Sequence, residues 1–186
     1  MTGLHALWLP IVLSAVAVFI LSSVIHMMLP WHKGDFAKLP NEDGVMSALR
    51  QFNLAPGDYM APRPASMADM KSDAFKAKAA AGPRFVMTIM PGGDLGMGKQ
   101  LASWFVYALV VSVFSGYVAG RALPVGAPYL HVFRFAGVMA FAGYALALSQ
   151  LSIWYARSWR ITITSSIDGL IYALFTAGLF GWLWPR

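Results

Sequence analysis

Asp168 is the residue whose position most strongly suggests chemistry. It stands inside a long apolar stretch, residues 161–184, which has the character of a membrane-spanning helix. An unpaired carboxylate at the centre of such a helix costs about 2.5–3.5 kcal/mol on insertion scales. We therefore expect Asp168 to face other helices and to have either a polar partner or a bound proton.

Two further polar residues are expected at the depth of Asp168. His26 lies near the end of the first apolar stretch and Gln150 near the end of the third, on the side of the membrane where the fourth begins. We predict an intramembrane polar cluster of His26, Gln150 and Asp168. Such a cluster can be a proton or ligand site, or a hydrogen-bond network that packs helices, and we favour packing. Arg134 falls in the other leaflet and is interpreted as an anchor that reaches the headgroups.

Histidine and methionine residues raise the question of copper. His26 and His32 flank the start of a polar loop, and Met67 and Met70 within it are separated by two residues. Imidazole and thioether ligands suit Cu(I). Met67 and Met70 also fit the apolar face of a predicted helix, where methionine fills gaps in a core. We predict core packing, no metal site and no cofactor, and keep copper bound by these four residues as the alternative.

Other familiar chemistry finds little support. The chain has no cysteine, which excludes disulfides, thiolate metal sites and cysteine nucleophiles. Residues 93–100 match the glycines and the lysine of a phosphate-binding loop, but Gln100 takes the place of the Ser or Thr that binds magnesium. No nucleotide site is predicted.

Four apolar segments must position these residues. They are residues 4–29, 101–120, 129–155 and 161–184, and about 20 apolar residues span a hydrocarbon core of about 30 Å. Charged residues make up 12% of the chain, against about 25% in soluble proteins. We predict an all-α membrane protein with four transmembrane helices, the first two joined by a polar loop, residues 30–100, that contains both helix and strand.

Small residues recur at four-residue intervals on two of these helices. Stripes of this kind let helix backbones approach closely, either within one chain or between a chain and its partner. The second segment carries Ser112, Gly116 and Gly120, and the fourth carries Gly169, Ala173, Ala177 and Gly181. The expected partners are the lipid bilayer and either another membrane protein or a second copy of this chain.

The loop has a pattern of its own. Apolar residues at helical spacing predict a helix over 41–52 with Asn41 as N-cap. Ser66 and Asp69 resemble a capping box that opens a second helix, which Gly82 closes. Residues 85–90 are typical of a short strand, paired with the segment near Tyr59.

Charge favours one orientation and argues against nucleic acid as a partner. Nine of the fourteen Lys and Arg residues lie between Lys33 and Lys99, interleaved with seven of the eight acids, so there is no basic stripe. The positive-inside rule counts charges close to the span ends. By that count the loop is cytoplasmic and both termini lie outside.

A resemblance supports this setting. The stretch SSVIHMMLPWHKGDFAKLP (residues 22–40) and the later GPRFVMTIMP (residues 82–91) are similar to a family of small, uncharacterised bacterial inner-membrane proteins. The resemblance implies a bacterial inner-membrane protein and brings no activity, ligand or catalytic residue with it.

The leading functional hypothesis is therefore a non-catalytic accessory or assembly subunit of a larger membrane complex. The first alternative is a small-solute or proton pathway that uses His26, Gln150 and Asp168. The second is a copper-handling membrane protein.

Overall fold

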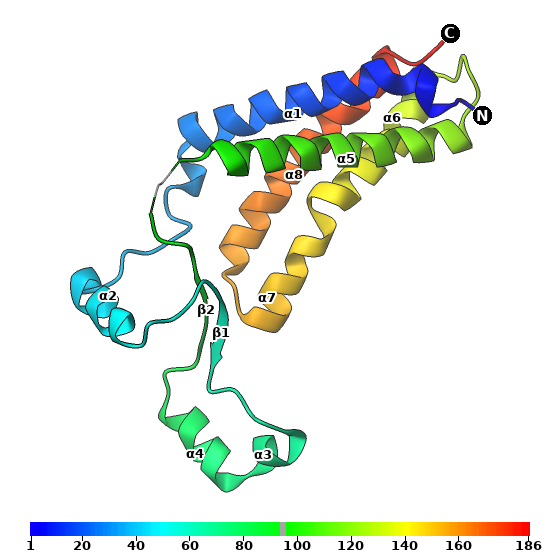
Figure 1. Cartoon of the computed structure of the whole chain (residues 1–186). Coiled ribbons are helices and arrows are strands. Elements are labelled where there is room, and N and C mark those ends of the chain that lie inside the picture. Colours follow the sequence, from blue (N-terminus) through cyan, green and yellow to red (C-terminus); the bar gives the residue numbers. More distant parts are fainter. Residues whose placement is uncertain (94–95) are drawn as a thin grey trace. The chain divides into compact units, whose positions relative to one another are not determined.

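The computed structural model describes residues 1–93 and 96–186 and is an all-α membrane protein with a small mixed loop, as predicted. Four helical segments are long and apolar enough to cross a membrane. They are Leu4–Met28 (a 3-10 turn, Leu4–Leu7, followed by α1, Trp8–Met28), α5 (Gly98–Ala122), Tyr129–Tyr155 and α8 (Trp159–Trp182). Figure 1 shows them side by side, with both chain termini at the same end of the bundle.

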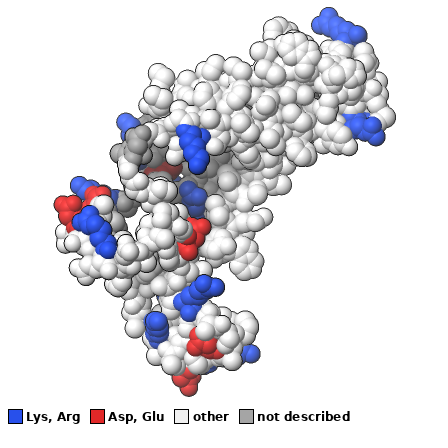
Figure 2. Space-filling view, in the orientation of Figure 1, with Lys and Arg blue, Asp and Glu red and all other residues white. Residues whose placement is uncertain are grey.

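The chain divides into two compact units. The membrane unit is Met1–Phe36 with Gly96–Arg186, and the loop unit is Ala37–Leu95. Within the membrane unit, α1 packs on α5 and α8, and α8 packs on α6 (Tyr129–Tyr144), which in turn packs on α5. Charged side chains are sparse over the helices in Figure 2, as a lipid-facing surface requires.

The predicted small-residue stripes pack inside this bundle. An added Cβ at Gly120 would lie 2.5 Å from the carbonyl oxygen of Thr2, and one at Gly169 would lie 2.8 Å from the Cβ of Ala145. Gly116 similarly faces Ile11 and Phe180, and Gly181 faces Tyr129. Ser112, Ala173 and Ala177 are at most 2% exposed. The stripes thus join helices of one chain, the first of the two roles considered for them.

The third span is interrupted, which its sequence does not predict. α6 ends at Tyr144, a 3-10 turn covers Leu146–Leu148, and α7 covers Ser149–Tyr155. The residues at the break, Ala145 to Leu148, are good helix formers, so no helix breaker marks the position. The break lies where Gly169 of α8 approaches Tyr144 and Ala145 most closely.

The loop unit contains two of the predicted features as expected. α2 is Glu42–Gln51, and the Asn41 side chain caps it by accepting from the Gly44 N–H at 3.3 Å. β1 (Gly57–Ala61) and β2 (Phe85–Ile89) form an antiparallel pair in which Tyr59 lies opposite Met87.

Two predictions for the loop were wrong. The single helix expected from Ser66 to Gly82 is α3 (Met67–Lys71) and α4 (Asp73–Ala81), because Ser72 is itself an N-cap that accepts from the Phe75 N–H at 3.1 Å. Met67 and Met70 do not pack in a core: they are 68% and 42% exposed, and no described residue of the loop unit is buried.

The glycine-rich segment 93–100 includes Asp94 and Leu95, which lie outside the described residues.

Candidate functional site

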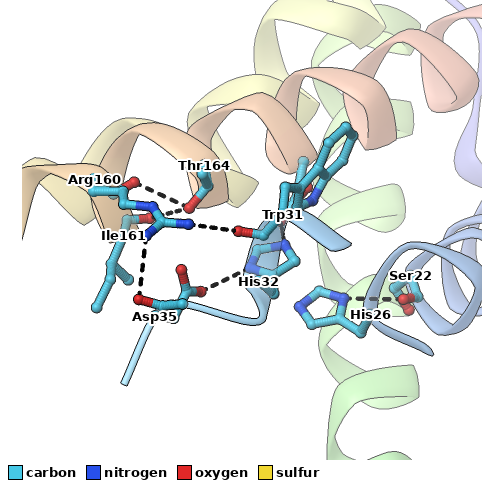
Figure 3. A network of polar contacts seen from close by, with 10 residues as sticks. Ser22, His26, Trp31, His32, Asp35, Arg160, Ile161 and Thr164 are labelled. Carbon is cyan, nitrogen blue, oxygen red and sulfur yellow. Dashed lines mark hydrogen bonds and ion pairs between the residues drawn. The ribbon is translucent and has the colours of Figure 1, made fainter. Parts of the chain in front are cut away.

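A proline-directed turn at the end of α1 creates the site. Leu29 is extended (φ −89°, ψ 142°), as a residue before proline tends to be, and Pro30 opens a 3-10 turn, Pro30–His32. The chain therefore leaves the helix axis and folds back instead of continuing away from the membrane. The ring of His32 stacks on that of His26, with centroids 4.5 Å apart and planes 6° from parallel (Figure 3).

Asp168 completes the cluster from α8. Its Oδ2 lies 2.8 Å from His32 Nε2, and the residue is 3% exposed. One potential metal-ligand atom from each of His26, His32 and Asp168 lies within 4.8 Å of the others. The sequence-based expectation that His26 and Asp168 lie at one depth agrees with this arrangement.

Gln150, the third residue predicted for the cluster, has a different environment. It is exposed on α7, and among the described residues no hydrogen bond joins it to His26 or Asp168. Ser152 faces α8 instead, 2.6 Å from the Thr162 hydroxyl. Two residues along a helix correspond to about 200° of rotation, so Gln150 points away from the face that Ser152 presents to α8.

Two residues of the site, His32 and Asp35, were not predicted from the sequence to belong to the cluster. His32 was considered only for copper, and Asp35 was not considered at all. Their signal is the short spacing after Pro30, with Asp35 three residues beyond His32, where one turn brings the side chains together. Asp35 Oδ2 accepts from His32 Nδ1 at 2.8 Å.

Both histidines are oriented through Nδ1. His26 Nδ1 donates to the carbonyl oxygen of Ser22 at 3.0 Å, an oxygen that can only accept. His32 Nδ1 donates to Asp35. These partners assign the proton of each ring to Nδ1, so that in the neutral form each Nε2 carries a lone pair.

His32 Nε2, with its lone pair, then lies 2.8 Å from a carboxylate oxygen of Asp168. The two atoms form an ion pair when His32 is protonated. Both His32 Nε2 and Asp168 Oδ1 are buried without a hydrogen-bond partner among the described residues. Two electron-rich atoms held this close in a buried site repel each other unless a cation lies with them. The cation can be a proton or a metal ion.

The electrostatics of the site favour positive charge. Burial lowers the pKa of His32, but the hydrogen bond to Asp35 and the negative charges of Asp168 and Asp35 outweigh it, so the pKa is raised above its ordinary value. The same two carboxylates would stabilise any other cation at this position.

The start of α8 holds the turn in place. Arg160 donates from Nη1 to the Gly34 carbonyl at 3.4 Å and from Nη2 to the Trp31 carbonyl at 3.5 Å (Figure 3). A Cβ on Gly34 would lie 2.6 Å from Arg160 Nη1, so glycine permits this close approach. α8 therefore provides both the carboxylate of Asp168 and the guanidinium that fixes the His32 turn.

The copper alternative combined residues that now belong to different units. His26 and His32 are in the membrane unit, whereas Met67 and Met70 are in the loop unit on α3.

Comparison of the chain with models of known protein families, with curated proteins and with solved structures found no match.

Proposed function

We propose that this multi-pass membrane protein binds a divalent first-row transition-metal ion through His26, His32 and Asp168, at the end of its first span. The observation that carries the proposal is the close pair of His32 Nε2 and the buried Asp168 carboxylate, which lie 2.8 Å apart, while Nε2 has no hydrogen-bond partner among the described residues. His26 supplies a third donor within 4.8 Å.

The surroundings of the two histidines support metal binding. Histidines that bind metals usually donate their other ring N–H to a carboxylate or a backbone carbonyl, which fixes the tautomer and strengthens the ligand. His32 does so to Asp35 and His26 to the Ser22 carbonyl. Both ligand rings of one site therefore have the outer contact that a metal ligand needs.

The donor set indicates which ions fit. Two imidazoles and a carboxylate suit Zn(II), Fe(II) and similar divalent ions, whereas Cu(I) prefers thiolate and thioether sulfur. Ligands about 2.0–2.1 Å from a tetrahedral ion are about 3.4 Å apart, so His32 Nε2 and Asp168 Oδ2, which lie 2.8 Å apart, must separate slightly when an ion binds. Parallel rings cannot direct both lone pairs at one ion, and we expect His26, whose side chain is exposed, to rotate out of the stack.

Three protein ligands leave a coordination position open. Structural zinc sites are usually closed by four protein ligands, while sites that exchange an ion or activate a bound molecule keep a position free. The exposure of His26 gives that position access from outside the protein. The proposal therefore favours metal handling or metal-dependent chemistry over a purely structural ion.

Cobalt titration tests the proposal directly. The full chain, purified in detergent and treated with a chelator, is titrated with Co²⁺ while its visible d–d absorption is recorded, and Zn²⁺ is then added in competition. We expect one ion per chain. Asp168→Asn and His26→Gln should each weaken binding by at least about 100-fold, beyond the range known for second-shell changes. His131→Gln, which alters an exposed histidine outside the site, is the matched control.

Equal Co²⁺ affinity in the parent chain and in His26→Gln would overturn the proposal, as would the absence of any d–d band. His26 is exposed, so its replacement tests binding without removing a buried group. Thermal unfolding in detergent checks that Asp168→Asn still folds.

A second candidate function, an accessory subunit of a membrane complex, is favoured by the surface of the loop unit. No described residue of this unit is buried, and large apolar side chains are exposed on it, among them Phe52 at 70% and Met90 at 78%. A partner protein would bury such surface. A photo-crosslinker at Phe52 should capture a defined partner in membranes; a chain that remains a lone monomer after crosslinking and mild detergent extraction would contradict this function.

A further inference from the structure

Arg134 lies in an unusual environment for a charged residue. It is exposed on α6 within the third span and lines an apolar groove of about 340 Å³ on the outside of the bundle. The other lining residues are Val118 of α5 and Phe135, Val138, Met139 and Ala142 of α6. A guanidinium in a membrane span is costly unless it is paired or reaches the headgroups.

No acid of the membrane unit is near enough to pair with it. This unit contains two acids, Asp35 and Asp168, and both belong to the histidine cluster. Asp168 is level with the end of α6, because Gly169 contacts Tyr144. Ten residues of helix separate Arg134 from Tyr144, which is about 15 Å along the axis. Among the described residues, no ion pair includes Arg134.

A second cation lies about one helical turn beyond a residue that lines the groove. Arg121 follows the lining residue Val118 by three residues near the end of α5, and is therefore on nearly the same helix face. The groove thus combines an apolar wall that fits a hydrocarbon chain with one lining arginine, Arg134, while Arg121 follows beyond Val118 on the leaflet side where α5 ends and α6 begins. Guanidinium groups bind phosphate oxygens bidentately.

We propose that this groove binds one anionic phospholipid, with an acyl chain along Phe135, Val138 and Met139 and the phosphate at Arg134. Arg121 adds a preference for a net negative headgroup, because a second arginine repels the cationic end of a zwitterionic headgroup. The site is independent of the histidine cluster and of the proposed metal.

The bundle contains a matched groove without charge. It has a volume of about 330 Å³ and is lined by Leu174, Phe175, Gly178, Leu179 and Trp182 of α8. The two grooves are similar in volume and in their apolar walls, and differ in the presence of Arg134. Comparing them separates specific lipid binding from the ordinary lipid layer around any membrane protein.

Lipid retention tests the proposal. The full chain is reconstituted in nanodiscs of equal phosphatidylglycerol and phosphatidylcholine, released into mild detergent, and examined by native mass spectrometry. We expect one phosphatidylglycerol retained per chain. Arg134→Gln should lower its affinity about ten- to hundredfold, as loss of a charge-assisted contact does. Val138→Trp, which fills the groove at a 72% exposed position, should displace the same lipid.

Leu174→Trp, which fills the uncharged groove instead, should leave that lipid bound. Equal retention of phosphatidylglycerol and phosphatidylcholine by the parent chain would overturn the proposal. So would unchanged retention in Arg134→Gln, because the groove would then bind hydrocarbon without regard to charge. Loss of the lipid in Leu174→Trp to the same extent as in Val138→Trp would also contradict a site at Arg134.

Discussion

A neutral His32 with its proton on Nδ1 places an electron-rich Nε2 2.8 Å from the carboxylate of Asp168 in the fourth span. Asp35 fixes that tautomer from the other side of the ring. An aspartate, a histidine and a second aspartate in line attract a cation more strongly than either carboxylate alone, because burial weakens screening by water. The strength of the site therefore depends on Asp35, although Asp35 is not itself a proposed ligand.

Replacing Asp35 by Asn should weaken metal binding without abolishing it. The amide removes a negative charge and a good acceptor from His32 Nδ1, and changes of this kind usually cost about 10- to 100-fold in metal affinity. Co²⁺ titration should still give one ion per chain, with the same d–d band, at a higher dissociation constant. Asp73→Asn, which removes an exposed acid paired with Lys76, is the control. An unchanged constant in Asp35→Asn would show that Asp35 does not act on the site.

Only part of this cluster could be predicted from the sequence. His26 and Asp168 could be placed at one depth because both lie in spans, where length and direction fix the level of each residue. His32 and Asp35 lie beyond the span, and their positions depend on the backbone turn at Pro30 and on its contact with Arg160. Gln150 was placed at the right end of its span, but its direction depends on how the helix is rotated, which depth alone does not give.

Helix α8 contributes to the site in two ways, and both act on the turn that carries His32. Its first turn carries Arg160, which holds the carbonyls of Trp31 and Gly34, and its third turn carries Asp168. The segment after α1 is thereby attached to the helix that completes the cluster. The break in the third span could not be predicted because helix-forming residues occupy it, whereas the spans themselves could be predicted from hydropathy.

Removing the contact between Arg160 and the turn that carries His32 should weaken metal binding, although Arg160 and Gly34 are not proposed ligands. Gly34→Ala places a methyl group against the Arg160 guanidinium, and Arg160→Gln removes the donor. Each change should raise the Co²⁺ dissociation constant, and the double variant should be no weaker than the worse single one, because both remove one contact. Gly98→Ala adds a methyl group where no atom lies within 4 Å and should have no effect. Additive losses would mean that Gly34 and Arg160 act separately.

The whole molecule combines a tightly packed membrane unit with a loop unit that lacks a core of its own. Two clusters of buried apolar residues hold the four spans together, one of them around Ala15, Ala108 and Ala140 and the other around Leu7, Val132 and Phe180. The loop unit depends on local devices instead: caps at Asn41, Ser66 and Ser72 and one antiparallel strand pair. Backbone held mainly by local contacts opens at low free energy.

We predict that both termini lie on one face of the membrane and the loop unit on the other, because four is an even number of spans. Because the chain has no cysteine, single cysteines at the exposed Leu4, Arg186 and Phe52 report on sidedness without background. A membrane-impermeant maleimide applied to intact cells should label the cysteines at Leu4 and Arg186, since the positive-inside rule places the termini outside. The cysteine at Phe52 should react only after the membrane is permeabilised. Labels at Leu4 and Arg186 that differ from each other would contradict an even number of spans. If the cysteine at Phe52 reacts in intact cells and those at Leu4 and Arg186 react only after permeabilisation, the four spans stand and the orientation is inverted. The His26–Asp168 cluster would then lie at the outer face.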